Sequence, residues 1–135
     1  MSVPASNVSS MTLEAVILAL RESWGPDTCA PEDVADWTPD NPARGQCATT
    51  ALVLHDFFGG SLVMGEVIVD GERVDFHWWN RLADGEQVDI TLEQFGPHEH
   101  VVGAMEVRRP TGTIRHQKEY DLLSSRVSAR LARSA

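Results

Sequence analysis

The stretch VDFHWWNRLADGEQVDITL, residues 74–92, decides the fold. Two segments rich in β-branched and aromatic side chains, residues 74–82 and 87–92, flank the turn Ala83-Asp84-Gly85. Such segments favour β-strands, and a short loop that contains glycine between them is typical of a hairpin. The stretch therefore predicts two antiparallel strands with a defined register.

The register follows from the turn. A three-residue loop with glycine in the left-handed conformation pairs Leu82 with Glu86, so that Trp79 lies opposite Asp89. Because side chains alternate along a strand, His77, Trp79 and Asp89 then share one face. His77 and Asp89 become diagonal neighbours, close enough for the carboxylate to orient the imidazole. A two-residue loop would place them on opposite faces, so this prediction depends on the turn type.

The rest of the chain supplies helices and further strands. Hydrophobic spacing predicts helices over residues 12–24, 46–58 and 119–133, strands over 62–64, 67–69 and 103–108, and a long loop over 26–45. The period changes from helical to alternating after Gly59-Gly60. We therefore predict one α+β domain over residues 1–135, with a flexible segment at 1–10 and the 46–58 helix packed on an antiparallel meander.

Composition excludes several classes of protein. The 135 residues are 42% hydrophobic and 23% charged, which argues against disorder, collagen, coiled coils and disulfide scaffolds. The longest uncharged, mostly apolar run, residues 47–54, is far shorter than the roughly 20 residues that a membrane span needs. Residues 1–10 hold no basic residue and no apolar core of a secretory signal, so we expect a cytoplasmic protein.

Charge is distributed unevenly. Residues 108–135 contain seven basic and two acidic side chains, whereas residues 1–107 contain four basic and 18 acidic ones. An acidic body repels phosphate backbones, so we expect neither nucleic acid nor a membrane as partner. A peptide, a protein or a small acyl compound fits better.

Cys47 is the candidate nucleophile. It lies at the first turn of a predicted helix, where backbone N–H groups and the helix dipole stabilise a thiolate and lower its pKa. The alternative is a small apolar side chain that fills the core, as most free cysteines do. The chain has one other cysteine, Cys29, and we expect two thiols rather than a disulfide.

Cys47, His77 and Asp89 together have the composition of a catalytic triad. The thiolate attacks, the imidazole carries its proton, and the carboxylate fixes the tautomer of the imidazole. The alternative is that His77 and Asp89 are ordinary polar residues on the solvated face of a sheet.

Residues near the triad have supporting roles in this hypothesis. Gln46 either donates to an oxyanion or makes local hydrogen bonds at the helix start. Asn80 is expected on the face opposite His77, in a structural hydrogen bond. Trp78 and Trp79 must lie on opposite faces, one in the core and one beside the site. His98-Glu99-His100 has no further ligand nearby in sequence and no phosphate-binding loop exists, so we expect no metal and no cofactor.

Several motifs between Trp24 and Phe95 resemble the YunG family of small uncharacterised bacterial proteins. They are Trp37, Asn41-Pro42, Gly45-Gln46-Cys47-Ala48, Thr50-Ala51-Leu52-Val53, Gly59-Gly60, His77-Trp78-Trp79-Asn80-Arg81-Leu82, Gly85 and Val88-Asp89-Ile90-Thr91-Leu92-Glu93-Gln94-Phe95. More distantly, the helix-starting Gly-x-Cys, His-x-Trp-Asn and Val-Asp-x-Thr are similar to the core of transglutaminase-like cysteine enzymes. That resemblance implies a papain-like arrangement with Cys47 as nucleophile, His77 as general base and acid, and Asp89 as the orienting carboxylate.

Three functional hypotheses follow. The leading one is a cysteine hydrolase or acyltransferase that attacks an amide, ester or thioester carbonyl. The second is a non-catalytic binding or regulatory domain on the same scaffold. The third is an accessory protein in the maturation of a peptide natural product, with the triad acting on one dedicated partner.

Overall fold

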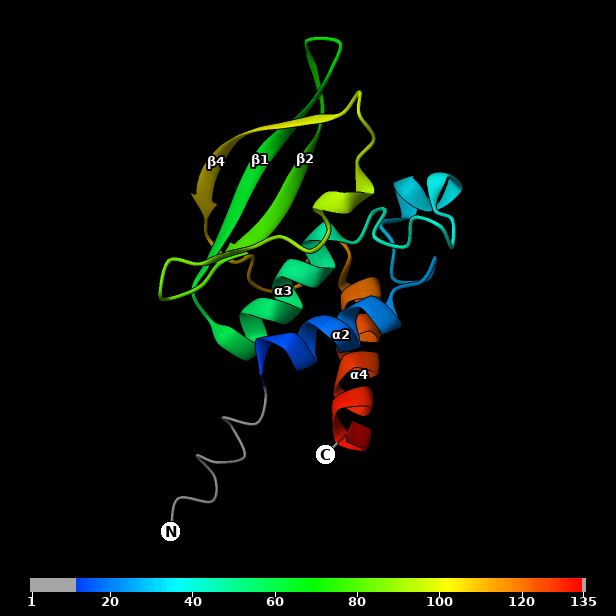
Figure 1. Cartoon of the computed structure of the whole chain (residues 1–135), viewed down its shortest axis with the longest axis vertical. Helices are drawn as coiled ribbons and strands as arrows, with labels where there is room; N and C mark the ends of the chain where they lie inside the picture. Colours follow the sequence, from blue (N-terminus) through cyan, green and yellow to red (C-terminus); the bar gives the residue numbers. More distant parts are fainter. Residues whose placement is uncertain (1–11, 135) are drawn as a thin grey trace.

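The computed structural model describes residues 12–134, so the segment 1–10 that we expected to be flexible lies outside the described residues. The elements in chain order are α2 (Leu13–Ser23), η1 (Pro31–Asp36), α3 (Cys47–Phe58), β1 (Ser61–Val69), β2 (Glu72–Arg81), β3 (Gln87–Val88), η2 (Leu92–Gln94), β4 (His100–Val107) and α4 (Gln117–Ser134). This order confirms the α+β class. Three α-helices gather on one side of a curled sheet (Figure 1).

The helix ends follow the sequence signals. Thr12 caps α2, because its Oγ1 accepts the N–H of Ala15 at 3.1 Å. Helix α3 starts at Cys47, one residue later than predicted, and ends at Phe58. Gly59 follows with a φ of 67°, a conformation that glycine adopts without steric cost.

The sheet is antiparallel in the order β3-β2-β1-β4. Strand β4 pairs with β1, at Leu62↔Val107 and Ile68↔His100. The predicted meander is therefore wrong at its last step. Residues 89–99 carry the chain past the sheet to its opposite edge, where β1 has a free side for a strand. The segments 62–64 and 67–69 also form one continuous strand rather than two.

The hairpin has the predicted register. Asn80 pairs with Val88 and Arg81 pairs with Gln87. The N–H of Leu82 donates to the carbonyl of Glu86 at 2.8 Å, and the φ of Gly85 is 91°. The three-residue turn and the register are confirmed.

Strand β3 is shorter than predicted. It ends at Val88 instead of Leu92, because the next residues turn into η2. The Gln94 side chain accepts the N–H of Gly45 at 3.1 Å and donates to the carbonyl of Thr91 at 2.9 Å. These bonds draw residues 89–94 away from the plane of the sheet and toward the start of α3.

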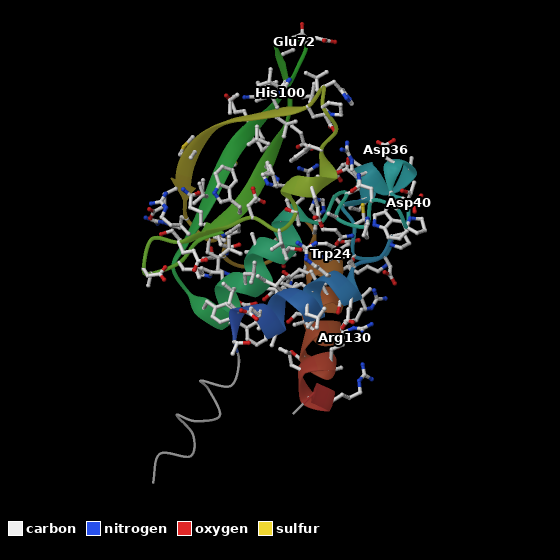
Figure 2. All side chains as sticks on the ribbon, viewed as in Figure 1. Trp24, Asp36, Asp40, Glu72, His100 and Arg130 are labelled. Carbon is white, nitrogen blue, oxygen red and sulfur yellow. The ribbon has the colours of Figure 1, made fainter. Side chains whose placement is uncertain are left out.

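The main core lies among the three α-helices and the β3 end of the sheet. Its fully or nearly buried side chains are Val16, Ala19, Leu20, Trp24, Ala43, Val53, Leu54, Val88, Leu123, Val127 and Leu131. Trp24, labelled in Figure 2, donates its indole N–H to Thr50 Oγ1 at 2.9 Å and so ties the end of α2 to α3. Strand β2 packs on α3 as well, so the core fixes α3 against both layers.

Among residues 12–134, no helix has the length and apolar character that crossing a membrane requires.

Candidate functional site

Cys47 is the first residue of α3 and is half-buried beside β2. Gly45, two residues earlier, has a φ of 71°, which sets the direction in which the chain enters the helix. The backbone N–H groups of Trp78 and Ala48 interact with the ionised sulfur and lower its pKa. The side chain therefore lies between the helix start and the outer edge of β2.

The prediction of a lowered thiol pKa is wrong for this structure. Burial raises the pKa of Cys47 to about 12, and the carboxylates of Asp75 and Asp89 raise it further. The N–H groups of Trp78 and Ala48 offset only part of that rise. Loss of hydration penalises the thiolate more than the helix start stabilises it, so the resting side chain is a neutral thiol.

His77 and Asp89 are brought together by the hairpin. His77 is fully buried, and its Nε2 lies 2.8 Å from each carboxylate oxygen of Asp89. Its ring stacks on Trp79 with centroids 5.6 Å apart and meets Phe95 edge-on at 4.9 Å. For Nε2 to donate to the carboxylate it must carry a proton, and in the neutral tautomer of that kind Nδ1 is the nitrogen that can accept one. Nδ1 is buried and has no hydrogen-bond partner.

The structure places Cys47 and the His77–Asp89 pair in one neighbourhood without a hydrogen bond between them. His77 Nδ1 has no partner, whereas the sulfur of Cys47 interacts with the N–H of Trp78, the next residue along β2. Asp89 also acts on the thiol through its charge. The sulfur, at the start of α3, thus lies against the backbone of β2 one position after His77.

Gln46 has a structural role that excludes it as an oxyanion donor here. The residue is fully buried, its Nε2 donates to the carbonyl of Gly25 at 2.9 Å, and its Oε1 accepts from Thr28 Oγ1 at 2.9 Å. The side chain therefore anchors the 25–28 turn to the start of α3. The structure therefore favours the structural alternative to an oxyanion donor, although the partners are distant in sequence rather than local to the helix start.

Asn80 and the two tryptophans lie as the alternation predicts. Asn80 is buried and donates to the carbonyl of Ala51 in α3 at 2.9 Å, which is a structural hydrogen bond. Trp79 is buried and donates to Gln87 Oε1 at 2.7 Å. Trp78 is half-buried and faces open pockets. One tryptophan thus packs inside the fold and supports His77, while the other forms a wall beside Cys47.

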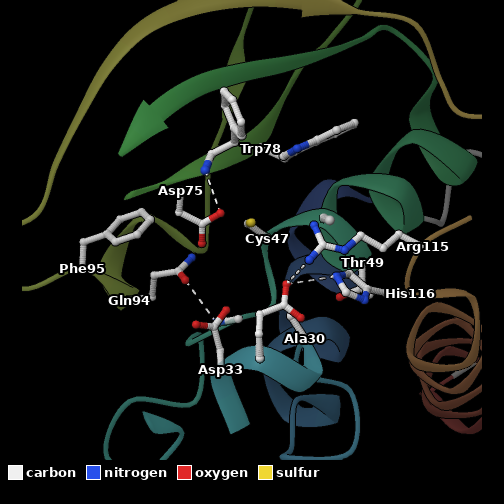
Figure 3. A pocket seen from close by; sticks show the side chains of 14 residues that line it. Ala30, Asp33, Cys47, Thr49, Asp75, Trp78, Gln94, Phe95, Arg115 and His116 are labelled. Carbon is white, nitrogen blue, oxygen red and sulfur yellow. Dashed lines mark hydrogen bonds and ion pairs between the residues drawn. The ribbon is translucent and has the colours of Figure 1, made fainter. Parts of the chain in front are cut away.

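A pocket of about 120 Å³ opens at Cys47 (Figure 3). We call it the Cys47 pocket, and its lining residues are Ala30, Glu32, Asp33, Gly45, Cys47, Ala48, Thr49, Asp75, Phe76, Trp78, Gln94, Phe95, Arg115 and His116. Figure 3 shows Cys47 near its centre, with Asp75 on one side and Arg115 and His116 on the other.

Most of these lining residues were not predicted from the sequence. Asp75 was predictable, since it lies two positions before His77 on the same predicted strand. Arg115 and His116 were not, because they follow β4 and reach the pocket only through its pairing with β1. Both contact Glu32 of η1, at 2.9 Å and 3.6 Å, and so join the segment before α4 to the pocket rim.

Comparison with known proteins places the chain in a family. The family model described as "YunG protein" matches residues 12–132. The chain belongs to the YunG family. A relative from Bacillus subtilis (strain 168), titled "Uncharacterized protein YunG", is 35% identical over 85 residues, which are 62% of this chain and 63% of the relative. The chain thus spans less than two thirds of that relative, and no solved structure matches the chain.

The other residues of this YunG-family chain that could be considered for metal binding or thiol chemistry make structural contacts. Glu99 of the His98-Glu99-His100 segment pairs with Arg44 at 3.2 Å and accepts the N–H of Gly96 at 3.0 Å. Within residues 12–134, no cluster of three or more His, Cys, Asp or Glu side chains is arranged to hold a metal ion. Cys29 is a free thiol, as is Cys47, and its sulfur donates to the carbonyl of Ala30 at 3.3 Å.

Proposed function

We propose that this YunG-family chain is a cysteine-dependent hydrolase or acyltransferase that attacks the carbonyl of an amide, ester or thioester. One observation carries the proposal: the His77–Asp89 pair leaves Nδ1 unpartnered beside the strand position that contacts Cys47. A cysteine at a helix start with histidine and aspartate on an adjacent hairpin also supports a papain-like, transglutaminase-like core.

In the first chemical step, His77 acts as general base. Nδ1 takes the proton of the Cys47 thiol while the sulfur attacks the carbonyl carbon, and the carbonyl π pair moves to oxygen. Asp89 stabilises the imidazolium that forms. The first turn of α3 has no side-chain cap at Gln46, so its backbone N–H groups are available to the oxyanion.

In the second step, the tetrahedral intermediate collapses to a thioester. The bond to the leaving amine, alcohol or thiol breaks, and the leaving group receives the proton from His77. Water or an amine then attacks the thioester, gives its proton to Nδ1, and releases the acid or the new amide as the thiol is restored.

The raised pKa of Cys47 determines the order of events in this mechanism. A thiol with a pKa of about 12 does not form a resting thiolate–imidazolium pair at neutral pH. Proton transfer to His77 must therefore accompany attack. The sulfur and Nδ1 must also come within hydrogen-bond distance when substrate enters the pocket.

The same observation favours a second candidate, a non-catalytic binding domain. A neutral, poorly ionised thiol without a hydrogen bond to His77 needs no catalytic role, and the amide of Gln46 is committed to Gly25 and Thr28. In that case the pocket binds its ligand without turnover.

Acylation by p-nitrophenyl acetate separates the two candidates. In a Cys29→Ala background, we expect p-nitrophenolate release and an acetyl group on Cys47, detected by mass spectrometry of peptides. Asp89→Asn keeps the side-chain volume and removes the carboxylate, and His77→Gln removes the base. We expect each to slow acetylation of Cys47 by about 10²-fold or more, the range of general-base catalysis.

Far-ultraviolet circular dichroism of each variant serves as the control for folding. If folded Asp89→Asn and His77→Gln acetylate Cys47 at the wild-type rate, the base has no role and the binding-domain candidate replaces the enzyme.

A further inference from the structure

The carboxylates of the Cys47 pocket are unequally neutralised. Glu32 is paired with Arg115 and His116. Among residues 12–134, Asp33 forms an ion pair only with Arg44, at 4.0 Å. Asp75 makes no ion pair with any described basic side chain, and its carboxylate accepts the N–H of the next residue, Phe76, at 2.7 Å.

Asp33 and Asp75 are close enough to repel each other. Burial raises the pKa of the Asp33 carboxyl, Arg44 lowers it, and the negative charge of Asp75 raises it again. Both side chains line the pocket, and Figure 3 shows them on the same side of Cys47. The pocket thus contains a pair of carboxylates with less positive charge around it than its own negative charge.

Aromatic rings complete this part of the pocket. Trp78 and Phe95 contribute to its walls, as does Phe76, whose ring already has the Arg73 guanidinium 4.7 Å from its centroid. The face of an aromatic ring attracts a cation, and the attraction grows where water is excluded. Rings and unneutralised carboxylates around one small pocket select for positive charge and against negative charge.

A second pocket, of about 150 Å³, adjoins the first. We call it the Ile114 pocket, and its lining residues are Ala48, Thr49, Leu52, Trp78, Pro110, Ile114, Arg115 and His116. Five of these residues also line the Cys47 pocket. The two pockets therefore meet at Trp78 and at the first turn of α3, and the second is mainly apolar near Leu52 and Ile114.

Building on the proposed function, we propose that the substrate is a peptide-like acyl compound with a cationic side chain, ammonium or guanidinium, that binds between Asp33 and Asp75. An apolar neighbouring group of the same substrate occupies the Ile114 pocket. The reacting carbonyl lies between the two groups, at Cys47. Asp33 and Asp75 repel an acyl compound that carries a carboxylate or phosphate in place of this cationic group, so such compounds are excluded.

Such a substrate also affects the nucleophile. Asp75 is one of the groups that raise the pKa of Cys47. A bound cation beside Asp75 offsets that effect and favours the thiolate in the complex. Recognition and activation then act through the same carboxylate.

The first test measures charge selectivity at Cys47 without any turnover. In a Cys29→Ala background, Cys47 is treated with three methanethiosulfonates that carry trimethylammonioethyl, sulfonatoethyl or methyl groups. The thiolate attacks the sulfenyl sulfur, a mixed disulfide forms, and methanesulfinate leaves. At low ionic strength we expect the cationic reagent to react at least about tenfold faster than the anionic one, relative to their rates with a free thiol.

Single substitutions identify the source of the selectivity. Asp75→Asn and Asp33→Asn should each reduce the cation-to-anion ratio about threefold to fivefold. Asp40→Asn removes the same charge from an exposed position outside both pockets and should leave the ratio unchanged. A ratio near one in the parent protein, or an equal loss with Asp40→Asn, would overturn the proposal.

The second test measures binding and remains informative even if Cys47 reacts slowly with every reagent. N-acetyl-lysine methylamide and N-acetyl-norleucine methylamide differ in the ε-ammonium group. We expect the lysine compound to shift the Trp78 indole N–H resonance at lower concentration, with that advantage lost in Asp75→Asn. Equal binding of the two compounds contradicts the cationic substrate. Acetylation of Cys47 at the wild-type rate in folded His77→Gln and Asp89→Asn would instead contradict the enzyme and leave these ratios intact.

Discussion

The two cysteines have similarly raised pKa values, but their surroundings differ in solvent access and in nearby hydrogen-bond donors. Burial raises the pKa of Cys29 and that of Cys47 to about 12. Cys29 is 1% exposed, donates to the carbonyl of Ala30, and would lie 2.4 Å from a Cβ added at Gly45. Cys47 is half-buried, opens to a pocket, and has the N–H groups of Trp78 and Ala48 within reach of its anion.

The pKa of a thiol therefore does not by itself identify a nucleophile. Around Cys29 the charged neighbours Asp33, Glu32 and Asp36 raise the pKa and only Arg44 lowers it. Around Cys47, backbone N–H groups lower the pKa and so offset part of the effect of burial. Such groups can also stabilise negative charge during a reaction. Access and the available donors distinguish the two sites.

The largest effect we expect is on the pH profile of alkylation. For both cysteines the rate with iodoacetamide should rise about tenfold per pH unit between roughly pH 7 and pH 10, because a thiol far below its pKa ionises tenfold more with each unit. Raised pKa values predict no plateau near pH 8.5. A plateau for Cys47 alone, measured by mass spectrometry of quenched samples, would show that its thiolate is stabilised beyond what this structure provides.

The next largest effect we expect is on the free energy of unfolding, when Gly45, which lies between the two cysteines in sequence, is substituted. Gly45→Ala should lower the free energy of unfolding by about 3 kcal/mol, from a positive φ and a Cβ at 2.4 Å from the Cys29 sulfur. Gly71→Ala is the matched control, since its φ is 80° but no atom lies within 4 Å of the added Cβ, and it should cost only about 1 kcal/mol.

Urea denaturation measures both substitutions. Adding Cys29→Ala to Gly45→Ala should recover about 1–2 kcal/mol relative to the sum of the single changes, because the clash with the sulfur disappears. Strict additivity of the two changes would place the strain of Gly45→Ala elsewhere.

A smaller difference should separate the two thiols in the native protein. At pH 8, iodoacetamide should label Cys47 about tenfold faster than Cys29, because Cys29 reacts only after local opening of its loop. Each rate is followed in the variant that lacks the other cysteine. Faster labelling of Cys29 would contradict the expectation that its sulfur is less accessible to solvent than that of Cys47.

The smallest effects come from single carboxylates. Asp75→Asn should lower the pKa of Cys47 and leave that of Cys29 unchanged, since Asp75 is among the charges that raise only the former. Asp33→Asn should do the reverse, because Asp33 is the leading charge acting on Cys29. Each change should alter the alkylation rate of its own cysteine by about twofold to fivefold. Equal effects on both thiols would indicate a general charge effect.

The local parts of the fold were predictable from sequence. Gly85 in a three-residue turn sets the register of the hairpin, and that register is enough to predict His77 beside Asp89. Alternation also separated Trp78 from Trp79. These predictions concern contacts a few residues apart along the chain, where turn geometry and side-chain direction decide the outcome.

The remaining features depend on contacts distant in sequence. Local sequence patterns do not show which distant segments come into contact. Such contacts determine the position of β4 beside β1, the early end of β3 and the bonds of Gln46 to the 25–28 turn. The prediction of a lowered pKa for Cys47 was wrong for the same reason. Helix position is a local property, whereas the burial that raises the pKa results from β2 and residues 89–95 closing around the helix start.

The Ala83-Asp84-Gly85 loop has an evolutionary consequence. Strand β3 holds only Gln87 and Val88 in the sheet, so the loop length sets the face that each position presents as the chain reaches Asp89. Deleting one codon from this loop would turn the carboxylate to the face opposite His77 while both residues stayed in the protein. A homologue with this deletion would lose the pair through a change in length that a search for substitutions at these two positions would overlook. In this chain, the number of residues between His77 and Asp89 determines their pairing as much as the residue types do.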